Sequence, residues 1–308
     1  SSHGIVLFYN IIHSLADIMP VIIIQGNHDL IQETDNENND LIKALLDSQK
    51  HQNIHYYDKT GSFEFDNIHF GLVSIRDMLD KNTSCGLVEE LPEFPTTHSN
   101  KLNIALSHAT VQNSLLHNYT KTTSGVPIEW FKDYDALLLG DIHLQAVKYN
   151  KKHDIFYGYP GSLVQQDFGE SIYNHGFLVW NIDENNKITT IDKFHVFNPV
   201  SRTCIKLIND EPYINAKDYI PFDDFLLMDD KPNDLHIRLY CKTKSSQVRE
   251  SILYKLSQHN MNAHIDIVSA NVLSNQITQD GLMNVDLESL NSSNTIIEFF
   301  KLYGNKEI

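Results

Sequence analysis

The chain has 308 residues, of which 41% are hydrophobic and 21% are charged, and its formal net charge at pH 7 is −16. These values are typical of a globular protein with room for two domains, and no apolar run approaches the roughly 20 residues that a membrane helix needs. Proteins that bind DNA tightly without a partner usually carry a basic face. The net negative charge of this chain therefore argues against tight DNA binding without a partner.

Apolar residues first recur at a helical spacing from Gly4 to Met19, and Pro20 ends the predicted helix. The apolar run Val21–Ile24 then predicts a central strand buried on both faces. It leads into the polar turn Gly26-Asn27-His28-Asp29, whose glycine permits a tight bend. The pattern next predicts a polar loop at 31–39, a helix at 41–49 and short strands at 54–57, 62–65 and 68–74. The last two of these strands are expected to form a hairpin.

Two further apolar runs also end in polar side chains. Residues 102–106 are followed by Ser107 and His108, and residues 135–139 by Gly140-Asp141-Ile142-His143. Because ligands and catalytic groups gather beyond the carboxyl ends of parallel strands, the three runs predict one shared polar site at a sheet edge. Oxygen and imidazole donors without cysteine favour a hard or borderline divalent ion. The alternative is that the histidines are satisfied core residues and that Asp141 only caps a turn.

The second half of the chain contains more strands and a candidate domain boundary. A hairpin is predicted over 147–157, a turn at Tyr159-Pro160-Gly161-Ser162 and a second hairpin over 177–194. Pro199 marks the boundary. Beyond it the pattern predicts strands at 203–208 and 234–241, a helix at 247–258, a strand at 264–268 and a last helix at 287–303.

The three strand-end motifs, taken in order, resemble the last three motifs of calcineurin-like metallophosphoesterases. The later segments 159–162, 168–170 and 175–177 are similar to those of SbcD-type repair nucleases, which include the meiotic-recombination-eleven protein. The resemblance covers Ile5 to Phe197. It implies an α/β metallophosphoesterase sandwich of two mixed sheets flanked by helices, residues 1–199, followed by a small α+β capping domain with a C-terminal helical segment, residues 200–308.

The resemblance also implies a role for each strand-end residue. Asn27, His108 and Asp141 would bind one divalent ion and His143 a second, and both ions would be manganese. His28 would contact the scissile phosphate, and Asp29 would orient that histidine. Asp141 stands where the family has the first histidine of Gly-His-x-His, although a carboxylate can bind the same cations.

The implied activity is metal-dependent hydrolysis of DNA phosphodiesters by the exonuclease and endonuclease subunit of a double-strand-break repair complex. Its partners would be DNA and an SbcC-like coiled-coil ATPase, with a homodimer as a further option and no membrane. Two alternatives stay open. One is a calcineurin-like phosphatase or nucleotide phosphodiesterase, which the acidic charge favours, and the other is a catalytically impaired subunit that binds a partner.

The family places an Asp-x-His and a Gly-Asp-x-x-Asp motif before the equivalent of the first helix, and neither precedes Gly26 here. The sequence is therefore expected to be a fragment that is inactive as it stands, because the ligand that bridges the two ions is missing. Three cysteines in no CxxC pair predict a reducing intracellular compartment, cytoplasm or nucleus. Richness in Asn, Ile and Lys is typical of proteins from AT-rich genomes, including viral ones.

Overall fold

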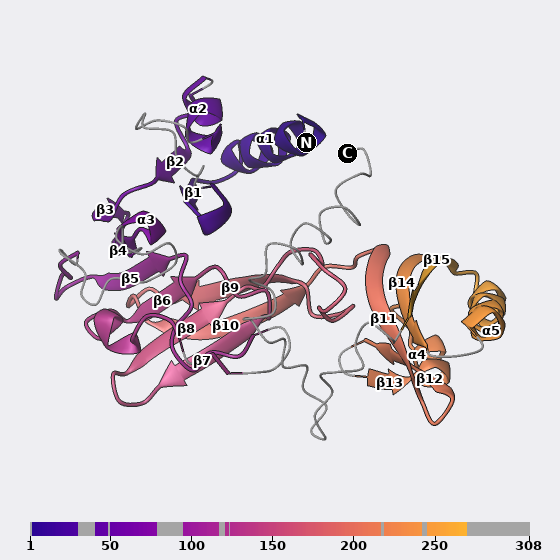
Figure 1. Cartoon of the computed structure of the whole chain (residues 1–308). Coiled ribbons are helices and arrows are strands. Elements are labelled where there is room, and N and C mark those ends of the chain that lie inside the picture. Colours follow the sequence, from indigo (N-terminus) through magenta and orange to yellow (C-terminus); the bar gives the residue numbers. More distant parts are fainter. Residues whose placement is uncertain are drawn as a thin grey trace, which may run out of the picture.

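The protein has a mixed α/β fold with several sheets and few helices (Figure 1). The computed structural model describes residues 2–29, 41–48, 50–78, 95–116, 121–122, 124–216, 219–241 and 245–269. Within these residues lie a six-stranded sheet, a five-stranded sheet and two strand pairs. In the described part of the chain, no helix is long and apolar enough to cross a membrane.

The six-stranded sheet has the order β3-β4-β5-β6-β8-β7. Its four inner strands run parallel, and each edge strand is antiparallel to its neighbour. All six residues of β5 are buried, as expected for a parallel strand with both faces covered. The bounds are β3 Gly61–Phe65, β4 Ile68–Val73, β5 Leu102–Ser107, β6 Ala136–Leu139, β7 Ala146–Asn150 and β8 Ile155–Tyr159.

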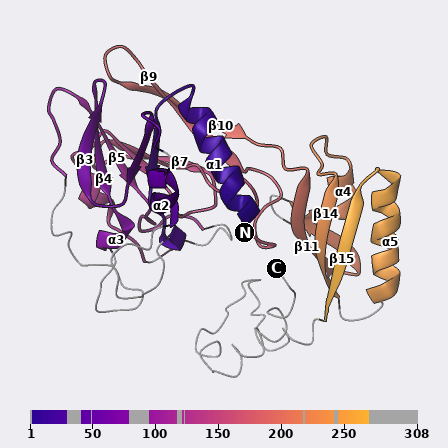
Figure 2. The ribbon, with the colours of Figure 1, turned by 90° about the horizontal axis from the view of Figure 1, so that it is seen from above.

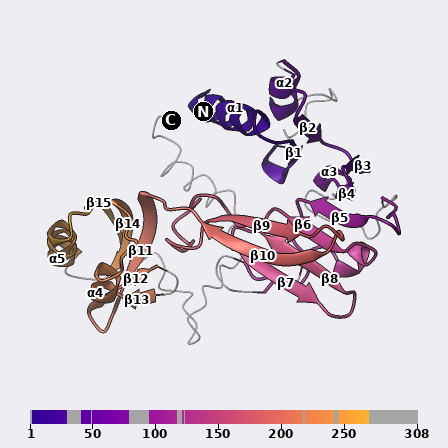
Figure 3. The same ribbon diagram turned by 180° about the vertical axis from the view of Figure 1, so that it is seen from behind.

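The two strand pairs form a second layer over one face of this sheet (Figure 3). In one pair β1 (Val21–Ile24) runs parallel to β2 (Ile54–Tyr57), and in the other β9 (Gly176–Ile182) runs antiparallel to β10 (Ile188–His195). Side chains from both pairs share one apolar cluster with the sheet; its members include Ile22, Ile24, Trp180, Ile182, Leu72, Ile104 and Leu106. A two-layer sandwich results.

The prediction for Val21–Ile24 was wrong in one respect. This strand does not join β5 and β6 in a single sheet but pairs with β2 in the second layer, and all four of its residues are only half-buried. A short apolar run indicates burial without indicating which neighbour completes the sheet, because both layers of a sandwich bury apolar faces. The helix α1 (Ser2–Ala16) lies beside this pair, and Asn53 Nδ2 donates to the Ala16 carbonyl oxygen at 2.8 Å.

The opposite face of the six-stranded sheet packs against loops and short helices. Phe131, Tyr134, Leu137 and Leu139 belong to the buried cluster on this side. The remaining elements of the first part of the chain are η1 Asn27–Asp29, α2 Leu41–Ser48, α3 Ile75–Met78 and η2 Ile128–Phe131. The predicted helix at 41–49 and the three predicted hairpins, which are β3–β4, β7–β8 and β9–β10, are confirmed. The loop at 31–39 lies outside the described residues.

The five-stranded sheet has the order β13-β12-β11-β14-β15 and its own apolar cluster. Figure 2 shows its strands β11, β14 and β15 side by side. The predicted strand–strand–helix–strand order is confirmed in β11, β14, α5 and β15, and the structure adds β12, β13 and α4 between the first two strands. Ile172, which precedes the predicted boundary at Pro199, also packs in this cluster. The bounds are β11 Val200–Ile208, β12 Glu211–Asn215, β13 Tyr219–Pro221, α4 Phe222–Leu226, β14 Asp234–Cys241, α5 Ser245–Gln258 and β15 Asn262–Ser269. The predicted helix at 287–303 lies outside the described residues.

Candidate metal centre

Three of the predicted site residues meet where the two layers of the sandwich face each other. His108 follows β5, Asp141 follows β6 after one glycine, and Asn27 begins η1 after β1. The Nε2 atom of His108 lies 3.1 Å from Asn27 Oδ1 and 3.7 Å from Asp141 Oδ1. The ends of β5 and β6 are neighbours in one sheet, whereas Asn27 comes from the second layer.

Two glycines make room for the His108 ring. A Cβ atom added at Gly140 would lie 2.5 Å from His108 Nδ1, and one added at Gly26 would lie 3.2 Å from His108 Cε1. The first distance is too short for any side chain, so the ring packs directly on the Gly140 backbone. The glycines in both strand-end turns therefore serve close packing around the histidine.

Replacing Gly140 by alanine is expected to push the His108 ring aside and to cost about 1–3 kcal/mol of folding stability, because overpacking forces neighbours out of their rotamers. Denaturant unfolding would measure the cost, and the NMR signals of the His108 ring would report its displacement. Gly61→Ala is the matched control, since its Cβ would meet no atom within 4 Å. Equal effects of the two substitutions would contradict this account of Gly140.

Asp141 adopts a backbone conformation that few side chains tolerate. Its φ angle is 81°, in the left-handed region where aspartate, asparagine and histidine are enriched among non-glycine residues. The Thr110 hydroxyl donates a short hydrogen bond to Asp141 Oδ2, which leaves Oδ1 on the side of His108. The turn thus holds this carboxylate beside the imidazole.

The surroundings of His108 favour its neutral form. Burial is the main cause that lowers its pKa below the usual histidine value, and the positive charge that His28 and His143 can carry acts in the same direction. The carboxylates of Asp141 and Asp29 oppose the shift without cancelling it. A neutral imidazole is the form that binds metal ions, so the environment suits a ligand.

Asp29 has a local structural role in addition to any role toward His28. Its Oδ2 atom accepts a hydrogen bond from the Gly26 backbone N–H at 2.9 Å, which closes the turn that carries Asn27 and His28. Both of these residues are exposed. The orientation of His28 by Asp29 stays a prediction.

His143 is held by a residue that was not predicted to belong to the site. Its Nδ1 atom lies 2.6 Å from Oε1 of Glu170, whose side chain is 2% exposed. The turn containing Gly161 also packs here, since Ser162 N–H donates to the His143 carbonyl at 3.1 Å and Gly161 has a φ of 78°. Glu170 belongs to the segment 168–170 that carries the resemblance, but only the fold reveals that its carboxylate is buried against a histidine.

The donor set fits a divalent ion. Ligand atoms about 2.1 Å from a common ion lie roughly 3–3.5 Å apart, close to the spacings measured around His108 Nε2. Among the described residues, no cluster of three His, Cys, Asp or Glu side chains suited to an ion is found. The trio here differs because its third member is the carboxamide of Asn27, a neutral oxygen donor of the kind that Mg²⁺, Ca²⁺ and Mn²⁺ accept.

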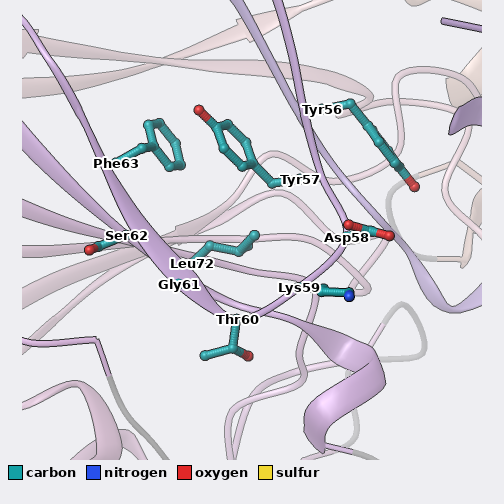
Figure 4. Close-up of a pocket in the computed structure, with 9 residues that line it drawn as sticks. All are labelled: Tyr56, Tyr57, Asp58, Lys59, Thr60, Gly61, Ser62, Phe63 and Leu72. Atoms are coloured by element: carbon teal, nitrogen blue, oxygen red, sulfur yellow. The ribbon is translucent and has the colours of Figure 1, made fainter. Parts of the chain in front are cut away.

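A pocket of about 230 Å³ lies away from these residues. It is lined by residues 56–63, which run from β2 into β3, and by Leu72 of β4 (Figure 4). Tyr57 and Phe63 stack there, with ring centroids 4.0 Å apart and planes inclined by 6°. Its lining contains none of the predicted site residues and only Asp58 and Lys59 as charged groups. It therefore adds nothing to the metal centre.

Comparison with known proteins identifies a viral relative. No protein-family model matches the chain. An uncharacterized protein of Acanthamoeba polyphaga mimivirus is 31% identical over 202 residues, which are 65% of this chain and 14% of that protein. The chain thus matches a small part of the relative's length, and the relative's name states no activity. The viral origin of this relative is consistent with the composition of the chain, which is typical of AT-rich genomes, including viral ones.

Proposed function

We propose that the chain is an SbcD-type metallophosphoesterase, which hydrolyses DNA phosphodiesters with two divalent ions, most simply Mn²⁺. The observation that carries the proposal is the convergence of Asn27 Oδ1, His108 Nε2 and Asp141 Oδ1 from three separate turns. Residues far apart in sequence have no structural need to bring an amide, an imidazole and a carboxylate together at the protein surface. Ion binding supplies such a need.

Each candidate site residue has a separate role in the proposed hydrolysis. Asn27, His108 and Asp141 would hold one ion, and His143 would bind the second. A bound divalent ion would supply Lewis acidity toward the phosphate oxygens and the attacking water. His28, exposed on η1, would donate a hydrogen bond to the phosphate and could protonate the leaving oxygen.

The finer fold assignment belongs to the same proposal. The packing of β1–β2 and β9–β10 on the six-stranded sheet supports a calcineurin-like sandwich, and the five-stranded sheet with α5 supports a capping domain from residue 200 onward. Because a net charge of −16 disfavours binding to phosphates, it supports an ATPase partner that contributes part of the affinity for DNA.

Calorimetric titration of the purified 308-residue chain with Mn²⁺ tests the metal centre. We expect saturable binding that His264→Ala, a substitution on the exposed face of β15, leaves unchanged. We also expect hydrolysis of linear duplex DNA close to background, because the Asp-x-His and Gly-Asp-x-x-Asp motifs do not precede Gly26. An absence of Mn²⁺ binding would overturn the proposal. Robust Mn²⁺-dependent cleavage that His143→Ala abolishes would support the nuclease and contradict the expected inactivity.

A second candidate is a catalytically impaired subunit that keeps the fold and binds an ATPase partner. The observation that favours it is Asp141 at the position of a family histidine, since the added negative charge would reduce the Lewis acidity of the neighbouring ion. Tight Mn²⁺ binding without hydrolysis, even when the partner and the upstream motifs are supplied, would favour this candidate.

A further inference from the structure

Glu170 is a buried glutamate whose side chain contacts that of an exposed histidine. Its side chain is 2% exposed, whereas that of His143 is 42% exposed. In the described part of the chain, no lysine or arginine lies within ion-pair distance of Glu170, and His143 is the basic side chain that contacts it. A carboxylate this buried requires hydrogen-bond donors, because burial without them costs several kcal/mol. The short 2.6 Å contact makes His143 Nδ1–H the donor to Glu170 Oε1.

The other neighbours of Glu170 reinforce this direction of donation. Its Oε2 atom accepts the Gln166 backbone N–H at 3.0 Å. His175 Nε2 lies 2.7 Å from the Ser171 carbonyl oxygen and therefore donates to it, while His175 Nδ1 lies 2.9 Å from Ser162 Oγ and 3.3 Å from the Ser162 carbonyl oxygen. Ser162 Oγ lies closer to His175 Nδ1 than to Glu170 Oε2, which is 3.4 Å away, so the contact of Ser162 with Glu170 is weaker than that of His143.

The loop that carries Glu170 is tied to the five-stranded sheet. Gln165 Oε1 accepts the Arg202 backbone N–H at 2.6 Å, and Gln165 Nε2 donates to the Glu170 carbonyl at 3.0 Å. The guanidinium of Arg238 lies 4.0 Å over the Phe168 ring. Strands β11 and β14 thus hold the loop, and the Glu170 carboxylate is fixed in place before any ligand arrives.

We propose that Glu170 is a positioning residue that keeps the His143 hydrogen on Nδ1 and so leaves the Nε2 lone pair for a divalent ion. A neutral imidazole has one N–H, and the partner of one ring nitrogen decides the state of the other. Carboxylate partners of this kind orient metal-binding histidines and raise their basicity, and their loss typically weakens metal affinity by about 10–100-fold. The presence of an ion at Nε2 rests on the proposed function, whereas the Nδ1–H tautomer does not.

The first measurement needs no substitution. In the metal-free 308-residue chain with ¹⁵N-labelled histidine, we expect the His143 signals to show a protonated Nδ1 and an unprotonated Nε2. Glu170→Gln should remove this preference, because a carboxamide can also donate to Nδ1. The same variant should bind Mn²⁺ about 10–100-fold more weakly in calorimetry. Glu129→Gln is the matched control, since it neutralises an exposed carboxylate paired with Lys152.

The results of these measurements distinguish the role of Glu170 from the proposed metal-dependent function. A wild-type His143 that carries its hydrogen on Nε2 would overturn the role of Glu170, and this result does not depend on whether any variant folds. Unchanged tautomer and Mn²⁺ affinity in folded Glu170→Gln would overturn it as well. Failure of the wild-type chain to bind Mn²⁺ would overturn the proposed function and the ion at Nε2, while the tautomer would still decide the hydrogen bond to Glu170.

Discussion

Substitution of His108 by alanine is expected to weaken Mn²⁺ binding by more than about 100-fold, beyond the loss typical of a residue that only supports a ligand. The reason is geometric. His108 Nε2 is the atom that lies near both Asn27 Oδ1 and Asp141 Oδ1. Without the ring, Asn27 and Asp141 lose the donor atom that lies beside both of them. Calorimetric titration with Mn²⁺ measures the loss.

Two comparisons make this result specific. His108→Gln keeps much of the side-chain volume and offers an oxygen, so its stability against denaturant should stay closer to wild type while its affinity still falls. His264→Ala removes an exposed histidine from β15 and should change neither quantity. If His108→Ala bound Mn²⁺ as tightly as His264→Ala, the metal centre would have to be placed elsewhere.

The second large effect concerns Asp141. A carboxylate in place of an imidazole adds a negative charge beside the ion, which should tighten the binding of hard cations and reduce the ion's Lewis acidity. Asp141→His should therefore install the usual family ligand set without loss of folding, since histidine also tolerates the φ of 81°. Asp141→Ala should weaken the occupancy of one ion, and Mn²⁺ titration gives the stoichiometry of each variant.

Control variants separate charge from backbone strain and hydrogen bonding. Asp141→Gly removes the side chain at a φ angle that glycine adopts freely, so it should lose the ion as Asp141→Ala does but fold more stably. Thr110→Val removes the hydroxyl that donates to Asp141 Oδ2 and keeps the carboxylate. Identical stoichiometry and affinity in wild type, Asp141→His and Asp141→Ala would mean that Asp141 only shapes the turn after Gly140.

Much of the local structure could be predicted because each element carries its own signal. The buried strands β5 and β6 are continuous apolar runs, and the hairpin β9–β10 shows two strands around a polar turn. The elements that were missed, β12, β13 and α4, are short and mix polar with apolar residues. Their burial depends on the apolar cluster that they share with β11 and β14, so their sequences show no periodic apolar pattern from which they could be predicted.

The sequence by itself determined the residues of the candidate centre, because Asn, Asp and His residues at the end of an apolar run, two of them directly after a glycine, are a local pattern. Only the tertiary structure decided that Asn27 reaches His108 from a second layer, since pairing between strands depends on contacts across the whole sandwich. It also decided that Glu170 holds His143, because the burial of that carboxylate arises where its loop is tied to the five-stranded sheet. A glutamate in a polar loop carries no such signal until the fold excludes water from it.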